Sequence, residues 1–123
     1  MSAASDSGAL SDAYIAALEE IVERNQVWPR MAAKYGVENP VPPWKTSLDG
    51  LCDALDRAAC DANIPSFKER RDEEDALSAT VYANLPYPEN QLLALAHSLV
   101  VRGILDEAEL RQRLVKIRAR LEA

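Results

Sequence analysis

The amino-acid sequence predicts an all-α protein of about five helices, arranged as two stacked helical hairpins plus an N-terminal helix. Three observations support this. Of the 123 residues, 48% are apolar but only 6% are aromatic, and the helix formers Ala and Leu are abundant. Apolar residues recur at helical spacing along most of the chain, and no segment alternates as a strand does. The length suits one domain with its own hydrophobic core.

The N-terminal third divides into a tail and a helical arm. Residues 1–9 are small and polar, so we expect a disordered tail. Residues 10–36 form the arm, with a helix that begins near Ser11. Pro29 either ends this helix or starts a short turn of helix that stops at Gly36. The apolar face of the first helix consists of Ile15, Leu18 and Val22.

A proline-rich segment separates the arm from the rest of the chain. Residues 37–43 read VENPVPP and cannot form regular helix, so we interpret them as a stiff linker before a helical domain at 44–123. A helix runs from about Trp44 to Ala62, and Asn63 provides a stop. Its apolar face consists of Leu48, Leu51, Cys52, Leu55 and Ala59.

The next helix begins after Ser66, which forms a capping box with Glu69, and extends to about Ala83. The charged stretch KERRDEED dominates its first turns. Its apolar face is therefore thin and consists of Phe67, Leu77 and Val81.

Residues 84–88 form a turn in which Pro88 opens the fourth helix, and Gly103 ends that helix. Asp106 and Glu109 cap a fifth helix. A heptad-like stripe on this last helix consists of Leu110, Leu114, Ile117 and Leu121. Its basic face is most simply a solvated flank, made of Arg111, Arg113, Lys116, Arg118 and Arg120.

Charge and hydropathy exclude several classes of function. The formal net charge of −6 argues against a nucleic-acid partner. No apolar run approaches the roughly 18 residues that span a membrane. The N-terminal sequence has neither a basic region nor a long apolar core, so it is not a signal peptide. We therefore expect a cytoplasmic protein without a membrane partner.

The sequence shows no self-sufficient active site. Cys52 and Cys60 lie roughly 12 Å apart along one helix, beyond disulfide reach, so free thiols are expected. Two cysteines and one histidine do not supply a zinc site, and we predict no metal site in this chain. His97 lies within the apolar run LLALAHSLVV, which favours a satisfied or surface histidine over a general base. No Ser, Thr or Cys has an evident base partner.

Arg70 and Arg71 are candidate anion-binding residues. A guanidinium holds an oxyanion through two parallel hydrogen bonds. Adjacent helical residues point about 100° apart, so at most one of the two reaches a given pocket directly. The simpler alternative is that both form ion pairs with Glu74 and Asp75, one turn further along the helix.

A second candidate region surrounds the turn before the fourth helix. Tyr87, Asn90 and Gln91 combine apolar area with directional polar groups beside the rigid Pro88. Such a corner suits a partner interface or the wall of a small-ligand pocket. An ordinary loop packed on the core explains it equally well.

These features together resemble a known family. The segments that carry the resemblance are TVY (Thr80–Tyr82), the Pro86–Tyr87 corner, Leu92–Leu93, and the closing pattern from Glu109–Leu110 to Ile117–Arg118. In this order, within residues 44–121, they resemble the small helical β subunit of thiocyanate hydrolase. They are also similar to the N-terminal helical domain of the nitrile hydratase β subunit and to nitrile hydratase accessory proteins.

The resemblance implies a subunit that binds no cofactor itself. In that family a partner subunit carries a Cys-x-x-Cys-Ser-Cys claw with Co(III) or Fe(III) and oxidised cysteines. By resemblance Arg71, with Arg70 second, would contact the oxidised cysteine oxygens, and Tyr87, Asn90 and Gln91 would line the pocket for a nitrile or thiocyanate. An SH3-like barrel would come from a separate subunit.

Two other interpretations stay open. One is a nitrile hydratase accessory protein, a metallochaperone-like partner of the metal subunit, which the pair Pro43–Trp44 and the basic last helix would suit. The other is a helical interaction module with no link to nitriles.

Overall fold

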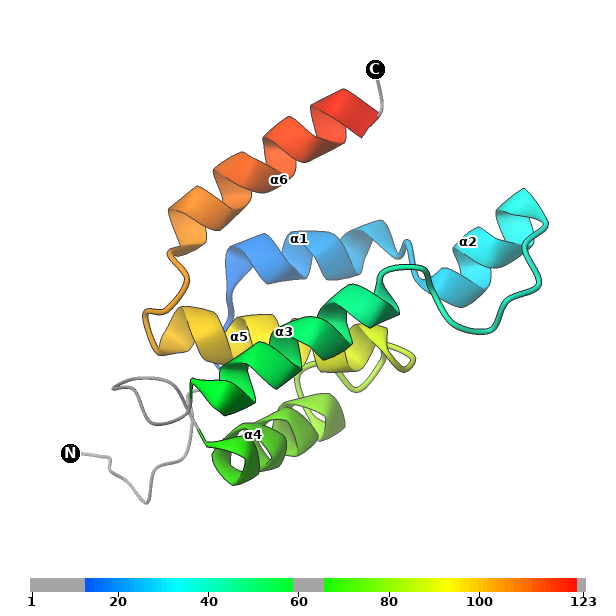
Figure 1. The fold of residues 1–123 in the computed structure, drawn as a ribbon. Coiled ribbons are helices and arrows are strands. Elements are labelled where there is room, and N and C mark those ends of the chain that lie inside the picture. The colour runs from blue at the N-terminus through cyan, green and yellow to red at the C-terminus, as the bar shows by residue number, and fades with distance from the viewer. Residues whose placement is uncertain (1–12, 59–65, 122–123) are drawn as a thin grey trace.

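The computed structural model describes residues 13–58 and 66–121, and within these ranges the chain is all-α, as predicted (Figure 1). The expected tail at 1–9, the thiol of Cys60 and Asn63 lie outside the described residues. Two expected helix bounds are wrong: the first helix begins at Ala16, after the extended Ile15, and not near Ser11, and the helix expected over about 44–62 ends at Arg57. The helices are α1 (Ala16–Arg24), α2 (Trp28–Tyr35), α3 (Lys45–Arg57), α4 (Phe67–Ala79), α5 (Glu89–Val101) and α6 (Glu107–Leu121).

Helix α5 forms the centre of the fold. Its sequence is apolar nearly all round, as expected of a helix that is covered on several sides. One core cluster joins it to α1 and α4, and Figure 1 shows α5 running between those two helices. A second cluster joins it to α3 through Leu48, Leu55, Leu95 and Leu99. The arm predicted at 10–36 therefore contributes its first helix to the core of the domain.

The sequence left two alternatives for Pro29: it ends the first helix, or it starts a short helix that stops at Gly36. The short helix is present as α2. Helix α1 ends at Arg24, where Asn25 takes the left-handed conformation with φ 53°. Pro29 lies in the first turn of α2, where its missing N–H costs nothing. Gly36, at φ 69°, ends α2, as predicted.

Helix α4 begins as predicted and ends earlier. The amide of Glu69 donates to Ser66 Oγ at 3.2 Å, and the amide of Ser66 donates to the Glu69 carboxylate at 3.3 Å, which completes the capping box. The expected end near Ala83 is wrong, because α4 stops at Ala79. The amide of Tyr82 donates back to the carbonyl of Leu77 at 2.9 Å, and this turn directs the Tyr82 side chain into the core.

The ends of α5 and α6 follow the sequence signals. Residues 80–88 form turns, and α5 begins directly after Pro88. After Val101 the chain turns at Gly103, which has φ 77°, and the amide of Ile104 donates to Leu99 at 2.9 Å. The amide of Glu109 donates to the Asp106 carboxylate at 2.9 Å, so Asp106 caps α6.

The helices pack unequally. The most extensive contact joins α4 to α5, that is, one predicted hairpin to the other. Helix α6 contains no buried residue and rises away from the other helices in Figure 1. It touches α1 near its own N-terminal end, where the amide of Ala17 donates to Glu107 at 3.1 Å.

Candidate functional site

One polar recess collects most of the predicted site residues. It has a volume of about 290 Å³ and lies where α4 faces the turn before α5 and the first turn of α5. Its walls are Arg71, Glu74, Asp75, Ser78, Tyr87, Asn90 and Gln91. Arg71 and the three residues predicted to bind substrate are thus brought together although 16 to 20 positions separate them in sequence. Arg70 lies outside this recess.

Arg71 is the exposed cation of the recess. Its side chain is 66% exposed, and its Nε atom lies 3.9 Å from a carboxylate oxygen of Asp75, one turn along α4. An exposed pair at that distance is weak, since water screens both charges and the side chains lose entropy on pairing. The Arg71 guanidinium is therefore easily transferred to a stronger acceptor.

Arg70 serves the interior instead. Only 4% exposed, it donates to Asp56 at 2.6 Å and to Glu74 at 3.1 Å, so it ties α3 to α4. Burial opposes its charged form, but the bond to Asp56 and the charge of Glu74 outweigh this effect and raise its pKa. Both predicted ion pairs with acidic neighbours are present. The two pairs differ in burial, because α3 covers Arg70.

The two acidic residues in the wall of the recess, Glu74 and Asp75, have different surroundings. Burial raises the pKa of the Glu74 carboxyl, and the neighbouring Arg70 acts against that shift. Asp75 is exposed and faces Arg71. Sequence interpretation treated these two residues only as ion-pair partners and did not consider Ser78. Their spacing contained the signal, because residues at i, i+3, i+4 and i+7 from Arg71 share one face of a helix.

Tyr87 forms the rim beside α3. The residue is 67% exposed, and Lys45 Nζ lies 5.6 Å from the ring centroid. Lys45 also bonds Asp49, and this bond is the main reason that its pKa is raised. A cation over the face of an aromatic ring is attracted to it. Helix α3 therefore restricts the position of the tyrosine ring.

Gln91 supplies an unused acceptor. Its Oε1 atom is buried, and among the described residues it has no hydrogen-bond partner. A buried carbonyl without a donor costs free energy that a ligand N–H or O–H can recover. The recess thus offers a positively charged hydrogen-bond donor, Arg71, on one wall and a neutral acceptor, Gln91 Oε1, on another.

Two buried contacts behind the recess hold α4 and its following turn on α5. Tyr82 Oη lies 2.8 Å from His97 Nδ1, so His97 is a satisfied core histidine, as the sequence favoured. Glu73 accepts from Ser98 Oγ at 2.8 Å and from the guanidinium of Arg102. Sequence interpretation missed this second contact. Its signal was Ser98, a polar residue in the apolar run of α5.

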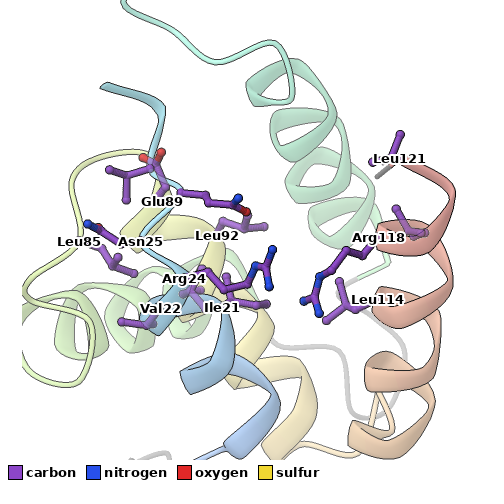
Figure 2. Close-up of a pocket in the computed structure, with 14 residues that line it drawn as sticks. Ile21, Val22, Arg24, Asn25, Leu85, Glu89, Leu92, Leu114, Arg118 and Leu121 are labelled. Atoms are coloured by element: carbon purple, nitrogen blue, oxygen red, sulfur yellow. The ribbon is translucent and has the colours of Figure 1, made fainter. Parts of the chain in front are cut away.

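A second hollow is larger and apolar. It has a volume of about 390 Å³ and lies between α1, the start of α5 and α6 (Figure 2). None of the predicted site residues lines it. The described residues contain no group of three or more His, Cys, Asp or Glu side chains that could hold a metal ion. Within the same ranges, no helix has both the length and the apolar character needed to cross a membrane.

No family model, curated protein or solved structure matches this chain.

Proposed function

We propose that this chain is the non-metal helical subunit of a hetero-oligomeric enzyme of the nitrile hydratase or thiocyanate hydrolase type, and that it completes the active-site pocket of a claw-bearing partner subunit. The observation that carries the proposal is the common recess of Arg71, Tyr87, Asn90 and Gln91. The sequence resemblance assigns these residues to one active-site pocket, and the packing of α4 on α5 brings them to one recess, which supports the proposal.

In this proposal Arg71 provides the contact to the metal subunit. Its guanidinium would exchange the long ion pair with Asp75 for two parallel hydrogen bonds to oxidised cysteine oxygens of the claw. Such a contact fixes and electrostatically tunes a metal ligand from outside the metal's own coordination sphere. Arg70 would support it indirectly, by holding α4 against α3.

The other wall would meet the substrate. Tyr87 gives apolar area, and Asn90 and Gln91 give polar groups that distinguish one small linear substrate from another. Hydration of a nitrile produces an amide, whose N–H groups match the buried Oε1 acceptor of Gln91. Thiocyanate offers the same carbon–nitrogen triple bond in an anion, for which Arg71 is the attractive group.

The metal would belong to the partner. The sequence holds only two cysteines and no Cys-x-x-Cys-Ser-Cys motif. The residues of this chain fit the role of outer contacts, since an exposed arginine suits oxidised sulfur oxygens. When bound in the partner, Co(III) or Fe(III) would act as a Lewis acid on the substrate. We place the assembly, with a separate SH3-like barrel subunit, in the cytoplasm.

The rival proposal is an accessory protein that binds the metal subunit only while the enzyme matures. Helix α6 favours this role because it is exposed and basic. An accessory protein needs such a binding surface, one that the mature enzyme does not bury.

Co-expression with a claw-bearing subunit separates the two. The subunit proposal predicts that the active enzyme retains this chain in a fixed stoichiometric ratio through size-exclusion chromatography. Active enzyme that contains little or none of this chain would overturn the subunit proposal. If its activity had also depended on co-expression, the accessory role would be supported.

A further inference from the structure

The last helix carries a coiled-coil pattern that the proposed function does not use. Its apolar stripe repeats at alternating spacings of four and three residues, which places Leu110 and Ile117 at heptad position d and Leu114 and Leu121 at position a. The positions that flank such a stripe are e and g. In α6 all four of them are arginine: Arg111, Arg113, Arg118 and Arg120.

Helix α1 already occupies the first half of this stripe. Leu110 packs against the core cluster that contains Leu18 of α1. Arg111, at an e position, forms an ion pair of 2.9 Å with Glu20 of α1. The N-terminal end of the stripe is therefore covered by α1, which contributes apolar side chains and a carboxylate.

The second half of the stripe has no such cover among the described residues. Helix α1 ends at Arg24, whereas α6 continues to Leu121 and diverges from it (Figure 1). The space between them is the apolar hollow of Figure 2, which Leu114 and Leu121 line from α6, and Ile21 and Leu92 line from α1 and α5. Leu121 is 75% exposed. Within the described ranges neither Arg118 nor Arg120 forms an ion pair, although Arg118 lines the hollow.

From these contacts we propose that the hollow between α1 and α6 binds an amphipathic helix of another protein, with apolar residues at heptad spacing and Asp or Glu residues flanking them. The apolar side of that helix would cover Leu114, Ile117 and Leu121. Its carboxylates would pair with Arg118 and Arg120, as Glu20 pairs with Arg111. The contact extends the pattern of α1 by about two helical turns.

Charge excludes a second copy of α6 as the occupant. In a parallel pair, position g of one helix faces position e of the other, and in an antiparallel pair like positions face each other. Either arrangement sets arginine against arginine. A membrane surface fits poorly as well, since the apolar residues line a hollow that faces α1 and α5 rather than a convex outer face.

This surface is separate from the Arg71 recess. Figure 1 shows α4 and α6 on opposite sides of α1 and α5, and no residue lines both hollows. The proposed helix site can therefore be tested independently of the proposed enzyme function.

A pair of designed peptides tests it. Each has about 21 residues, three heptads, with Leu at positions a and d. One carries Glu at every e and g position and the other carries Lys, and in both peptides like charges oppose self-pairing. Fluorescence anisotropy with the full chain is expected to show about tenfold tighter binding of the Glu peptide at low salt, weakening as NaCl is raised.

Charge reversal provides the decisive variant. The double substitution Arg118→Glu and Arg120→Glu is expected to reverse the preference toward the Lys peptide, whereas the control Arg57→Glu on α3 leaves it unchanged. Leu121→Asp, at an exposed position that does not affect folding, is expected to abolish binding of both peptides. Circular dichroism confirms that each variant keeps its helices.

Four results would overturn the proposal: no binding of the Glu peptide, equal binding of both peptides, no response to the double charge reversal, or displacement of the peptide by vesicles of anionic lipid. Concentration-dependent dimerisation that Leu121→Asp removes would assign the hollow to a second copy and would also overturn it.

Discussion

Arg70 and Arg71 are neighbours in the chain, yet α4 directs the first into a buried ion pair with Glu74 and leaves the second exposed at the rim of a recess. Consecutive helical side chains differ in direction by about 100°, so covering one of them with α3 leaves the other accessible. The candidate site depends on this division, because the same helix must be both anchored and available.

The two arginines should differ sharply in their contribution to stability. Arg70→Ala leaves Asp56 and the buried Glu74 without their cation and is expected to cost about 3–5 kcal/mol of unfolding free energy. Arg71→Ala removes only a long, exposed pair and should cost less than about 0.5 kcal/mol. Urea denaturation monitored by circular dichroism measures both. Equal losses would contradict the assignment of roles.

The burial of Tyr82 should make stability depend on alkaline pH. Burial raises the pKa of Tyr82 well above its usual range. Between the unfolded and folded pKa values the unfolded chain binds fewer protons, so the contribution of Tyr82 to the unfolding free energy should be constant below about pH 10 and fall above it. Tyr82→Phe should lower stability by about 1–2 kcal/mol at pH 7 and remove its share of that fall. A denaturant series from pH 7 to 11 tests this, and an unchanged slope in the variant would argue against it.

Two glycines should respond to alanine in opposite directions. Gly103 has φ 77°, a conformation that disfavours Cβ, so Gly103→Ala should cost about 1 kcal/mol. Gly50 lies inside α3 with open space around its Cα, so Gly50→Ala should stabilise by about 0.5–1 kcal/mol. Apart from chain neighbours and the backbone of the same helix, no heavy atom lies within 4 Å of either added Cβ. Thermal unfolding of the two variants should therefore show shifts of opposite sign.

Gln91 should matter to the ligand more than to the fold. Its buried Oε1 has no partner among the described residues, so Gln91→Leu breaks no hydrogen bond of that atom and should not lower stability. In the assembled enzyme the lost hydrogen bond should raise KM about 2- to 10-fold. Gln112→Leu, an exposed position on α6, serves as the control. A loss of stability in Gln91→Leu, with KM unaltered, would mean that the side chain is structural.

The sequence predicted the helix ends correctly at the positions where they carry strong local signals. Ser66 with Glu69, Gly103 and Asp106 act through hydrogen bonds or backbone conformations within a few residues. The end of α4 was placed too late because it depends on Tyr82. Its side chain enters the core beside α5, and this long-range contact leaves no local mark.

The burial of the ion pair between Arg70 and Glu74 could not be predicted from the pattern of apolar residues. Arg70 and Glu74 lie on the same face of α4 as Leu77, at i, i+4 and i+7, and thus occupy core-facing positions within a charged stretch. A pattern of apolar residues cannot reveal a stripe in which a charged pair replaces two of them. The common recess of Arg71 and Tyr87 likewise required the packing of α4 on α5, although the residues themselves were identified from sequence.

The most direct test of the proposed function is turnover of the complex reconstituted with Arg71→Lys, compared with Arg57→Lys as an exposed control outside the recess. Lysine keeps the charge but cannot form two parallel hydrogen bonds. Loss of an outer contact of this kind lowers metal-site activity about 10- to 100-fold. The proposal predicts that loss for Arg71→Lys with normal assembly, and wild-type turnover for Arg57→Lys. Wild-type turnover of a fully assembled Arg71→Lys complex would contradict it.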